Sequence, residues 1–261
     1  MYLLYFSVSL LASVIGGICG VGGGVIIKPV LDATGTMSVS CISFLSGCTV
    51  LSMSIISVLK NRRNQGMIDI KTSTPLAAGA VIGGILGKSL FELLKTVLQN
   101  ENHLGAAQAG LLIIVTLGAL LYSIYSGKIH TRHVKSILAC CLIGLALGMV
   151  SSFLGIGGGP INLTVLFFFF SMDTKKAAAN SLYIIMFSQL ASFLQTVIGG
   201  TVPPVSVLIL ALMVLAGIAG GMIGSRINKK ISADKVDSLF IGFMIVIVGI
   251  NIYNVIKFTI W

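Results

Sequence analysis

Residues 20–31 read GVGGGVIIKPVL and residues 155–166 read GIGGGPINLTVL, so one glycine triplet and its flanking residues occur twice, 135 positions apart. Similar stretches at a fixed spacing are typical of chains built from copies of one structural unit. We therefore predict two tandem repeats, residues 1–127 and residues 128–261.

The composition around these stretches is that of a membrane protein. Hydrophobic residues make up 56% of the chain and charged residues only 9%, with a mean hydropathy of +1.05. A soluble domain has about a quarter of its residues charged. The apolar runs reach the roughly 18 residues that a membrane helix needs, and they rarely alternate as barrel strands do. The sequence predicts an all-α, polytopic membrane protein of the cell membrane.

The net charge of +10 is distributed as in a membrane protein and not as in a nucleic-acid-binding domain. Most of the basic residues gather in three loops: Lys60, Arg62, Arg63 and Lys71; Lys128, Arg132 and Lys135; and Arg226, Lys229, Lys230 and Lys235. Clusters of Lys and Arg between apolar segments mark the cytoplasmic side of a bilayer. We expect the lipid bilayer, and no nucleic acid, as a partner.

Each repeat contains one long apolar segment, interrupted by the glycine triplet, followed by three ordinary spans. The segments are 3–35, 38–59, 73–94 and 104–126 in the first repeat, and 136–170, 177–199, 204–225 and 236–258 in the second. A straight helix of 33 to 35 residues would be about 50 Å long, which exceeds the roughly 30 Å hydrocarbon core. We predict that each interrupted segment folds into a hairpin of two short helices, the second beginning near Val25 or Pro160.

The loop charges also predict how the two repeats are oriented. In the first repeat the basic loop lies between the second and third segments, whereas residues 199–204 of the second repeat carry no Lys or Arg. The loop between the third and fourth segments shows the reverse pattern. This exchange indicates two inverted repeats, each with a glycine-broken helical hairpin that returns to its own side plus three transmembrane helices. The alternative is eight plain spans with the two copies parallel.

The two glycine triplets are candidate binding elements. Irregular backbone inside a membrane survives only where it lines a cavity or is buried in protein, and a helix that begins there presents free N–H groups and a positive dipole end to an anion. Broken helices that meet at the midplane of inverted repeats are typical of secondary transporters. The predicted substrate-binding glycines are Gly22, Gly23, Gly24, Gly157, Gly158 and Gly159. The alternative is close helix packing, which we favour for Gly83-Gly84-x-x-Gly87 and its counterpart Gly220-Gly221-x-x-Gly224.

Several polar residues near the triplets are further candidates for substrate binding. Asn162 lies in the first turn after its triplet, and Lys28 is an intramembrane charge that either faces the substrate or pairs with Asp32. The helices that follow the hairpins carry further candidates, which either line the cavity or bond between helices: Ser46, Asn180, Ser181 and Gln189. By contrast, we interpret Lys88 and Glu92 as a structural pair at i,i+4.

These stretches resemble a known family of membrane transporters. Residues Gly16–Leu31 and Gly148–Leu166, together with the step Asn180-Ser181-Leu182, are similar to the sulfite exporter TauE/SafE family. The resemblance covers nearly the whole chain, and it implies transport of sulfur oxyanions or organosulfonates.

We therefore predict a secondary transporter that moves a small, sulfite-like anion across the membrane by alternating access. An anion channel with the same midplane site is the alternative. An enzyme is not expected, because the seven Asp/Glu are scattered and the five cysteines lack metal-ligand spacing. No nucleotide-binding motif is present, and we expect neither a cofactor nor a metal. The sequence leaves open whether the chain forms a homo-oligomer.

Overall fold

The computed structural model describes residues 1–62, 67–98, 100–125 and 130–260, which form ten helices and no strand. Arg63 and Lys128, two members of the basic loops, lie outside the described residues. The helices of the first half are α1 (Tyr2–Cys19), α2 (Gly24–Thr34), α3 (Val39–Arg62), α4 (Ile70–Leu98) and α5 (Glu101–Tyr125). Those of the second half are α6 (Ile137–Leu154), α7 (Pro160–Phe170), α8 (Thr174–Ile198), α9 (Val207–Lys230) and α10 (Ala233–Ile260).

Eight of the described helices are long and apolar enough to cross a membrane, and α2 and α7 are the two that are not. This result confirms the predicted all-α polytopic class. The interruption at each triplet is also confirmed, because α2 begins at Gly24 and α7 at Pro160. The prediction of two short helices in each interrupted segment is wrong for the first arm, because α1 and α6 are each long enough to cross a membrane. The first arms, α1 and α6, have 18 residues, whereas α2 and α7 have 11.

The breaks follow from the backbone that the glycines adopt. Gly20 and Gly155 end α1 and α6 in the left-handed conformation, with φ of 78° and 66°. The N–H of each glycine donates a helix-ending hydrogen bond to a carbonyl of the preceding turn, as C-terminal glycines commonly do. In the second turn all three residues of the triplet have positive φ, and Pro160 then occupies the first position of α7. Proline suits this position because its missing N–H has no helical partner there.

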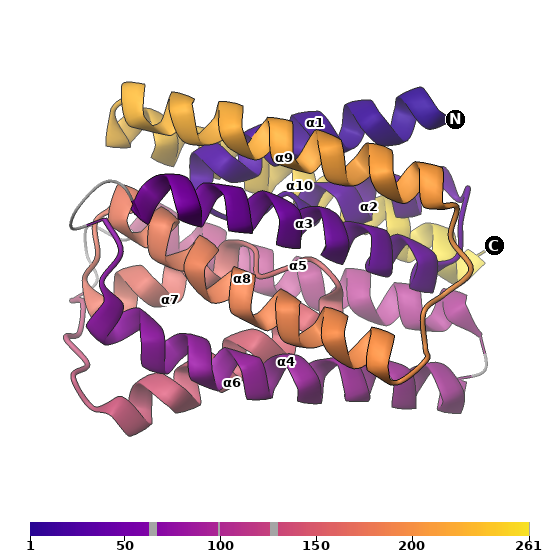
Figure 1. The fold of residues 1–261 in the computed structure, drawn as a ribbon, viewed down its shortest axis with the longest axis horizontal. Coiled ribbons are helices and arrows are strands. Elements are labelled where there is room, and N and C mark those ends of the chain that lie inside the picture. The colour runs from indigo at the N-terminus through magenta and orange to yellow at the C-terminus, as the bar shows by residue number, and fades with distance from the viewer. Residues whose placement is uncertain (63–66, 99, 126–129, 261) are drawn as a thin grey trace.

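The helices pair mainly between the two halves of the chain. Helix α1 packs against α9 and α4 packs against α6, while α3 lies beside α8 and α5 beside α10 (Figure 1). The packing interpretation of the second glycine motif is confirmed, since a Cβ on Gly83 or Gly87 would overlap backbone carbonyls of α6. Gly220 and Gly224 approach the backbone of α1 in the same way.

The chain ends and the connecting loops divide between two ends of the bundle. Figure 1 shows both termini and the loop from α8 to α9 at one end, with the end of α3 and the start of α4 at the other. Large apolar side chains cover the outside of the bundle, among them Leu3, Ile114, Leu138 and Val207, each more than two-thirds exposed. So many apolar side chains facing outward fit contact with lipid tails.

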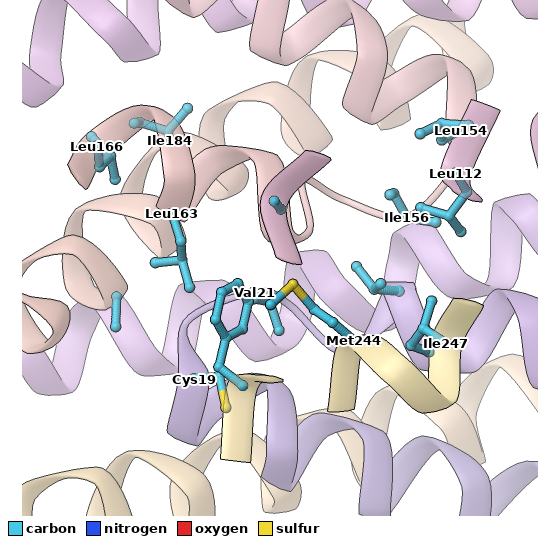
Figure 2. Close-up of a cluster of buried hydrophobic side chains, with 14 of the residues drawn as sticks. Cys19, Val21, Leu112, Leu154, Ile156, Leu163, Leu166, Ile184, Met244 and Ile247 are labelled. Carbon is cyan, nitrogen blue, oxygen red and sulfur yellow. The ribbon is translucent and has the colours of Figure 1, made fainter. Parts of the chain in front are cut away.

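The core of the molecule surrounds the two breaks. Val21 and Ile156, one from each glycine turn, are fully buried in the same cluster of hydrophobic side chains. Figure 2 shows this cluster, in which Leu154 and Leu112 lie near Ile156, and Met244 lies near Val21. The packing therefore holds both turns inside the protein, where their irregular backbone is shielded from lipid.

Candidate functional site

The two glycine turns touch each other. The N–H of Gly159 donates a hydrogen bond of 3.0 Å to the carbonyl oxygen of Val21. A Cβ added to Gly24 would overlap the carbonyl of Ile156, and one added to Gly22 would lie 3.7 Å from the carbonyl oxygen of Gly157. All six triplet glycines are buried. The structure therefore brings the two predicted triplets together at one point.

Backbone amides of the turns are left available at this point. Among the described residues, the N–H groups of Gly22, Gly157 and Gly158 donate to no protein acceptor. Helices α2 and α7 both begin here, so the positive ends of two helix dipoles add to the free donors. The walls are apolar, because a Cβ on Gly157 or Gly158 would collide with the side chain of Val50 or Ile185. Such an arrangement of donors within apolar walls suits a small, desolvated anion.

Asn162 lies where the sequence predicted it, against the second triplet. Its side chain is 1% exposed, and its Nδ2 atom is 2.7 Å from the position that a Cβ on Gly158 would take. The Oδ1 atom has no hydrogen-bond partner in the part of the chain that the structure describes. A buried amide oxygen without a donor is uncommon; this oxygen can only accept a hydrogen bond, so an anion would be bound by the Nδ2 group of the same side chain.

Three other predicted residues are likewise buried with polar atoms left unpartnered. The hydroxyls of Ser46 on α3 and Ser181 on α8 are inaccessible to solvent and bond to no described residue. The same holds for the Nε2 atom of Gln189 on α8. Helices α3 and α8 pack against each other, so all three groups come from the pair of helices that follows the two breaks.

Asn180 serves a different purpose in the structure. Its Oδ1 atom accepts hydrogen bonds from the N–H of Asp69 at 2.9 Å and from the hydroxyl of Ser73 at 2.5 Å. Its Nδ2 atom donates to the carbonyls of Met67 and Lys176. Except for the bond to Lys176, which lies within α8, these bonds fasten the start of α4 to α8. This is the bonding between helices that the sequence analysis gave as the alternative.

Lys28 also adopts the alternative arrangement. Its Nζ atom is 2.6 Å from Oδ2 of Asp32, and the two side chains are only 3% and 5% exposed. The pair lines a very small cavity of about 10 Å³, together with Gln108 on α5 and Asn251 on α10. Lys28 therefore reaches toward α5 and α10, and its charge is balanced by a carboxylate.

A cavity that the sequence analysis missed lies beside the breaks. Helices α3, α4, α6 and α8 surround a small cavity of about 30 Å³, which is lined by Lys88, Gln189 and Gly155 among others. The predicted pair is confirmed, with Nζ of Lys88 2.8 Å from Oε1 of Glu92, but Lys88 also faces this cavity. Its position one residue after the glycine stripe of α4 was a usable signal, because that stripe packs into the protein interior.

The sequence analysis also missed the polar side chains that bond to the carbonyl groups near the breaks. Asn228 of α9 donates to the carbonyl of Ile18 at the end of α1, and Gln108 of α5 donates to that of Phe153 at the end of α6. Asn254 of α10 donates to the carbonyl of Pro29 in α2 at 2.8 Å. Isolated Asn and Gln residues in apolar spans were the signal for these contacts.

Comparisons with known proteins identify a family of membrane transporters. The family model described as "Sulfite exporter TauE/SafE" matches residues 5–252. The chain is also similar to the "Probable membrane transporter protein YunE" of Bacillus subtilis (strain 168). The two are 23% identical over 278 residues, which cover 95% of this chain and 96% of the relative. No solved structure matches the chain significantly.

Proposed function

Because the chain belongs to the sulfite exporter TauE/SafE family, and is therefore a multi-pass membrane transporter and not an enzyme, we propose that it carries a small anion. The proposed substrate is a sulfur oxyanion or an organosulfonate, similar in size and charge to sulfite. The proposed mechanism is alternating access, driven by an ion gradient or by the gradient of the substrate itself.

One observation carries the proposal, namely the contact between the two glycine turns. Two short helices begin at a single buried point, and the amides of Gly22, Gly157 and Gly158 have no acceptor among the described residues. Backbone N–H groups at helix starts favour negative charge, and apolar walls strengthen each such interaction by excluding water. The anion would be bound by these amides, by Asn162, and by the hydroxyls of Ser46 and Ser181.

The arrangement of the helices supports the alternating part of the mechanism. Helices pair across the two halves in an equivalent way: α1 of the first half packs on α9 of the second, and its counterpart α6 packs on α4 of the first half. In our proposal residues 1–127 and 128–261 are inverted repeats that rock about the contact between the turns. Lys28 stays paired with Asp32 in this proposal, and Asn180 keeps α4 attached to α8.

The test is uptake of radiolabelled sulfite into liposomes that contain the purified protein. We expect saturable uptake that is faster when the liposomes are preloaded with unlabelled sulfite, because a carrier exchanges substrate across its alternating site. Sulfate, thiosulfate, taurine and short sulfonates serve as competitors. Stepwise single-channel currents without this exchange would favour a channel, and the absence of flux or binding for every anion tested would contradict the proposal.

A further inference from the structure

We infer that the cavity enclosed by α3, α4, α6 and α8 is a second anion-binding site, with Lys88 as the charged residue that contacts the substrate. This inference rests on the proposed transport of a small anion. It adds a cationic site beside the glycine turns, at which the anion binds on its way to or from the backbone amides.

The first observation is a set of unsatisfied polar atoms that line this cavity. They are the hydroxyls of Ser43 and Ser152 and the Nε2 atom of Gln189, and none has a partner within the described ranges of the chain. Their side chains are 9%, 5% and 4% exposed. Buried polar groups are nearly always hydrogen-bonded, so three unpartnered groups around one cavity indicate that a ligand or water completes them. All three can donate a hydrogen bond to an oxyanion.

The second observation is the charge at the same cavity. Lys88 is 13% exposed, and its ammonium lies 2.8 Å from Glu92 and 4.6 Å from the centre of the Phe91 ring. A lysine within a membrane span is costly and is usually retained for function. The ammonium has three donors, so it can keep its contact with Glu92 while another donor binds an anion in the cavity.

The second repeat shows that the fold does not need a lysine at this position. When the two repeats are aligned with the offset that relates Gly87 to Gly224, the residue equivalent to Lys88 is Ser225. The Ser225 hydroxyl bonds to the carbonyl of Gly221 at 2.7 Å and lies 3.2 Å from the hydroxyl of Ser57. The same helix arrangement therefore forms with a small, internally bonded residue, which argues against a purely structural reason for Lys88.

The cavity is adjacent to the proposed midplane site. It is lined by Gly155, the residue that ends α6 and lies two positions before the triplet. The Ser43 hydroxyl is 2.9 Å from the position that a Cβ on Gly155 would take. An anion held by Lys88 and Ser43 is thus close to the free amides of the turn. The cavity volume of about 30 Å³ has room for about two water molecules, so an anion that binds here displaces that water.

The experiment compares Lys88→Gln with Lys88→Arg in the full-length protein. Lys95→Gln is the matched control, because Lys95 is on the same helix but pairs with Glu101 at 3.3 Å outside the cavity. Sulfite affinity is measured by titration calorimetry in detergent, and sulfite uptake by liposome flux. We expect Lys88→Gln to weaken sulfite binding at least tenfold, Lys88→Arg to retain most of the affinity, and Lys95→Gln to match the parent.

The possible outcomes separate this inference from the proposed function. Parental sulfite affinity in Lys88→Gln, with the parent still transporting sulfite, would overturn the cavity site alone. A parent that binds and transports no anion would overturn both. If Lys88→Gln does not fold, the sulfite affinities of Ser152→Ala and Gln189→Leu test the inference instead. Each should weaken binding about threefold, and parental affinity in both would overturn the inference.

Discussion

At the scale of single residues, the glycines of the second turn carry the strongest conformational constraint in the chain. Gly157, Gly158 and Gly159 have φ values of 78°, 130° and 79°, in a region that other residues adopt only with strain. The first turn is less demanding, because Gly22 alone in its triplet has a positive φ. Glycine is therefore required for two separate reasons, backbone conformation in the second turn and close approach at Gly24.

We predict that Gly158→Val abolishes anion flux while the protein still reaches the membrane. The substitution forces a strained backbone, at a cost of about 1–3 kcal/mol, and its side chain would collide with Ile185 and with the amide of Asn162. The measurement is liposome flux, with the membrane level checked by immunoblot. Gly242→Val is the matched control, since a Cβ at Gly242 meets nothing within 4 Å. Equal loss of flux in both variants would argue against this account.

The sequence identified most of the residues at the centre of the molecule but not their bonding. The triplets, Asn162 and Ser46 could be predicted because glycine and polar residues are conspicuous in an apolar segment. The bonds of Asn180 could not, since they depend on the start of α4 lying beside α8. For Lys88, the i,i+4 spacing predicted the pair with Glu92, whereas the sequence analysis missed its position beside a cavity.

At the scale of helices, the broken segments depend on side chains from elsewhere in the chain. A helix that ends inside a membrane protein leaves carbonyl groups without intrahelical partners. Asn228 and Gln108 supply donors to such carbonyls at the ends of α1 and α6. Lys257 does the same for the end of α2, bonding to the carbonyls of Asp32 and Ala33. The contacts of Asn228 and Gln108 fix the two breaks to α9 and α5, and those of Lys257 fix the far end of α2 to α10.

We predict that Asn228→Leu lowers the free energy of unfolding by about 1–3 kcal/mol, because the carbonyl of Ile18 would lose its buried donor. The measurement is reversible denaturation in detergent or bicelles. Asn251→Leu is the control, because Asn251 is also buried but, among the described residues, donates a hydrogen bond only to Ile247 in its own helix. A loss in Asn251→Leu as large as that in Asn228→Leu would contradict the proposed role of the bond between helices.

The positions of the helices could be predicted from the sequence because apolar runs and their breaks define them. The predicted segments 38–59 and 236–258 correspond to α3 and α10, with ends that differ by a few residues. The unequal arms of the interrupted segments could not be predicted. Their lengths depend on where each arm packs, and α1 is buried along α9 while α2 contacts α10.

At the scale of the whole molecule, the pairing of helices between the two halves places the candidate site. The glycine turns come from opposite halves and meet because α1 packs on α9 and α6 packs on α4. Uniformly apolar spans carry little information about their neighbours, so the sequence did not reveal these pairs. The glycine stripes predicted close packing, and the structure identified α6 and α1 as their partners.

The inverted orientation of the two halves is the central claim, because both the meeting of the turns and alternating access depend on it. The direct test is labelling of single cysteines by a membrane-impermeant thiol reagent in intact cells, in a variant without the five native cysteines. Ile70→Cys and Lys230→Cys should be protected until the cells are opened, and Val202→Cys should react from outside. This pattern would place the loop between α3 and α4 and the loop between α9 and α10 in the cytoplasm, with the loop between α8 and α9 outside. Labelling of positions 70 and 202 from the same side would contradict the inverted arrangement.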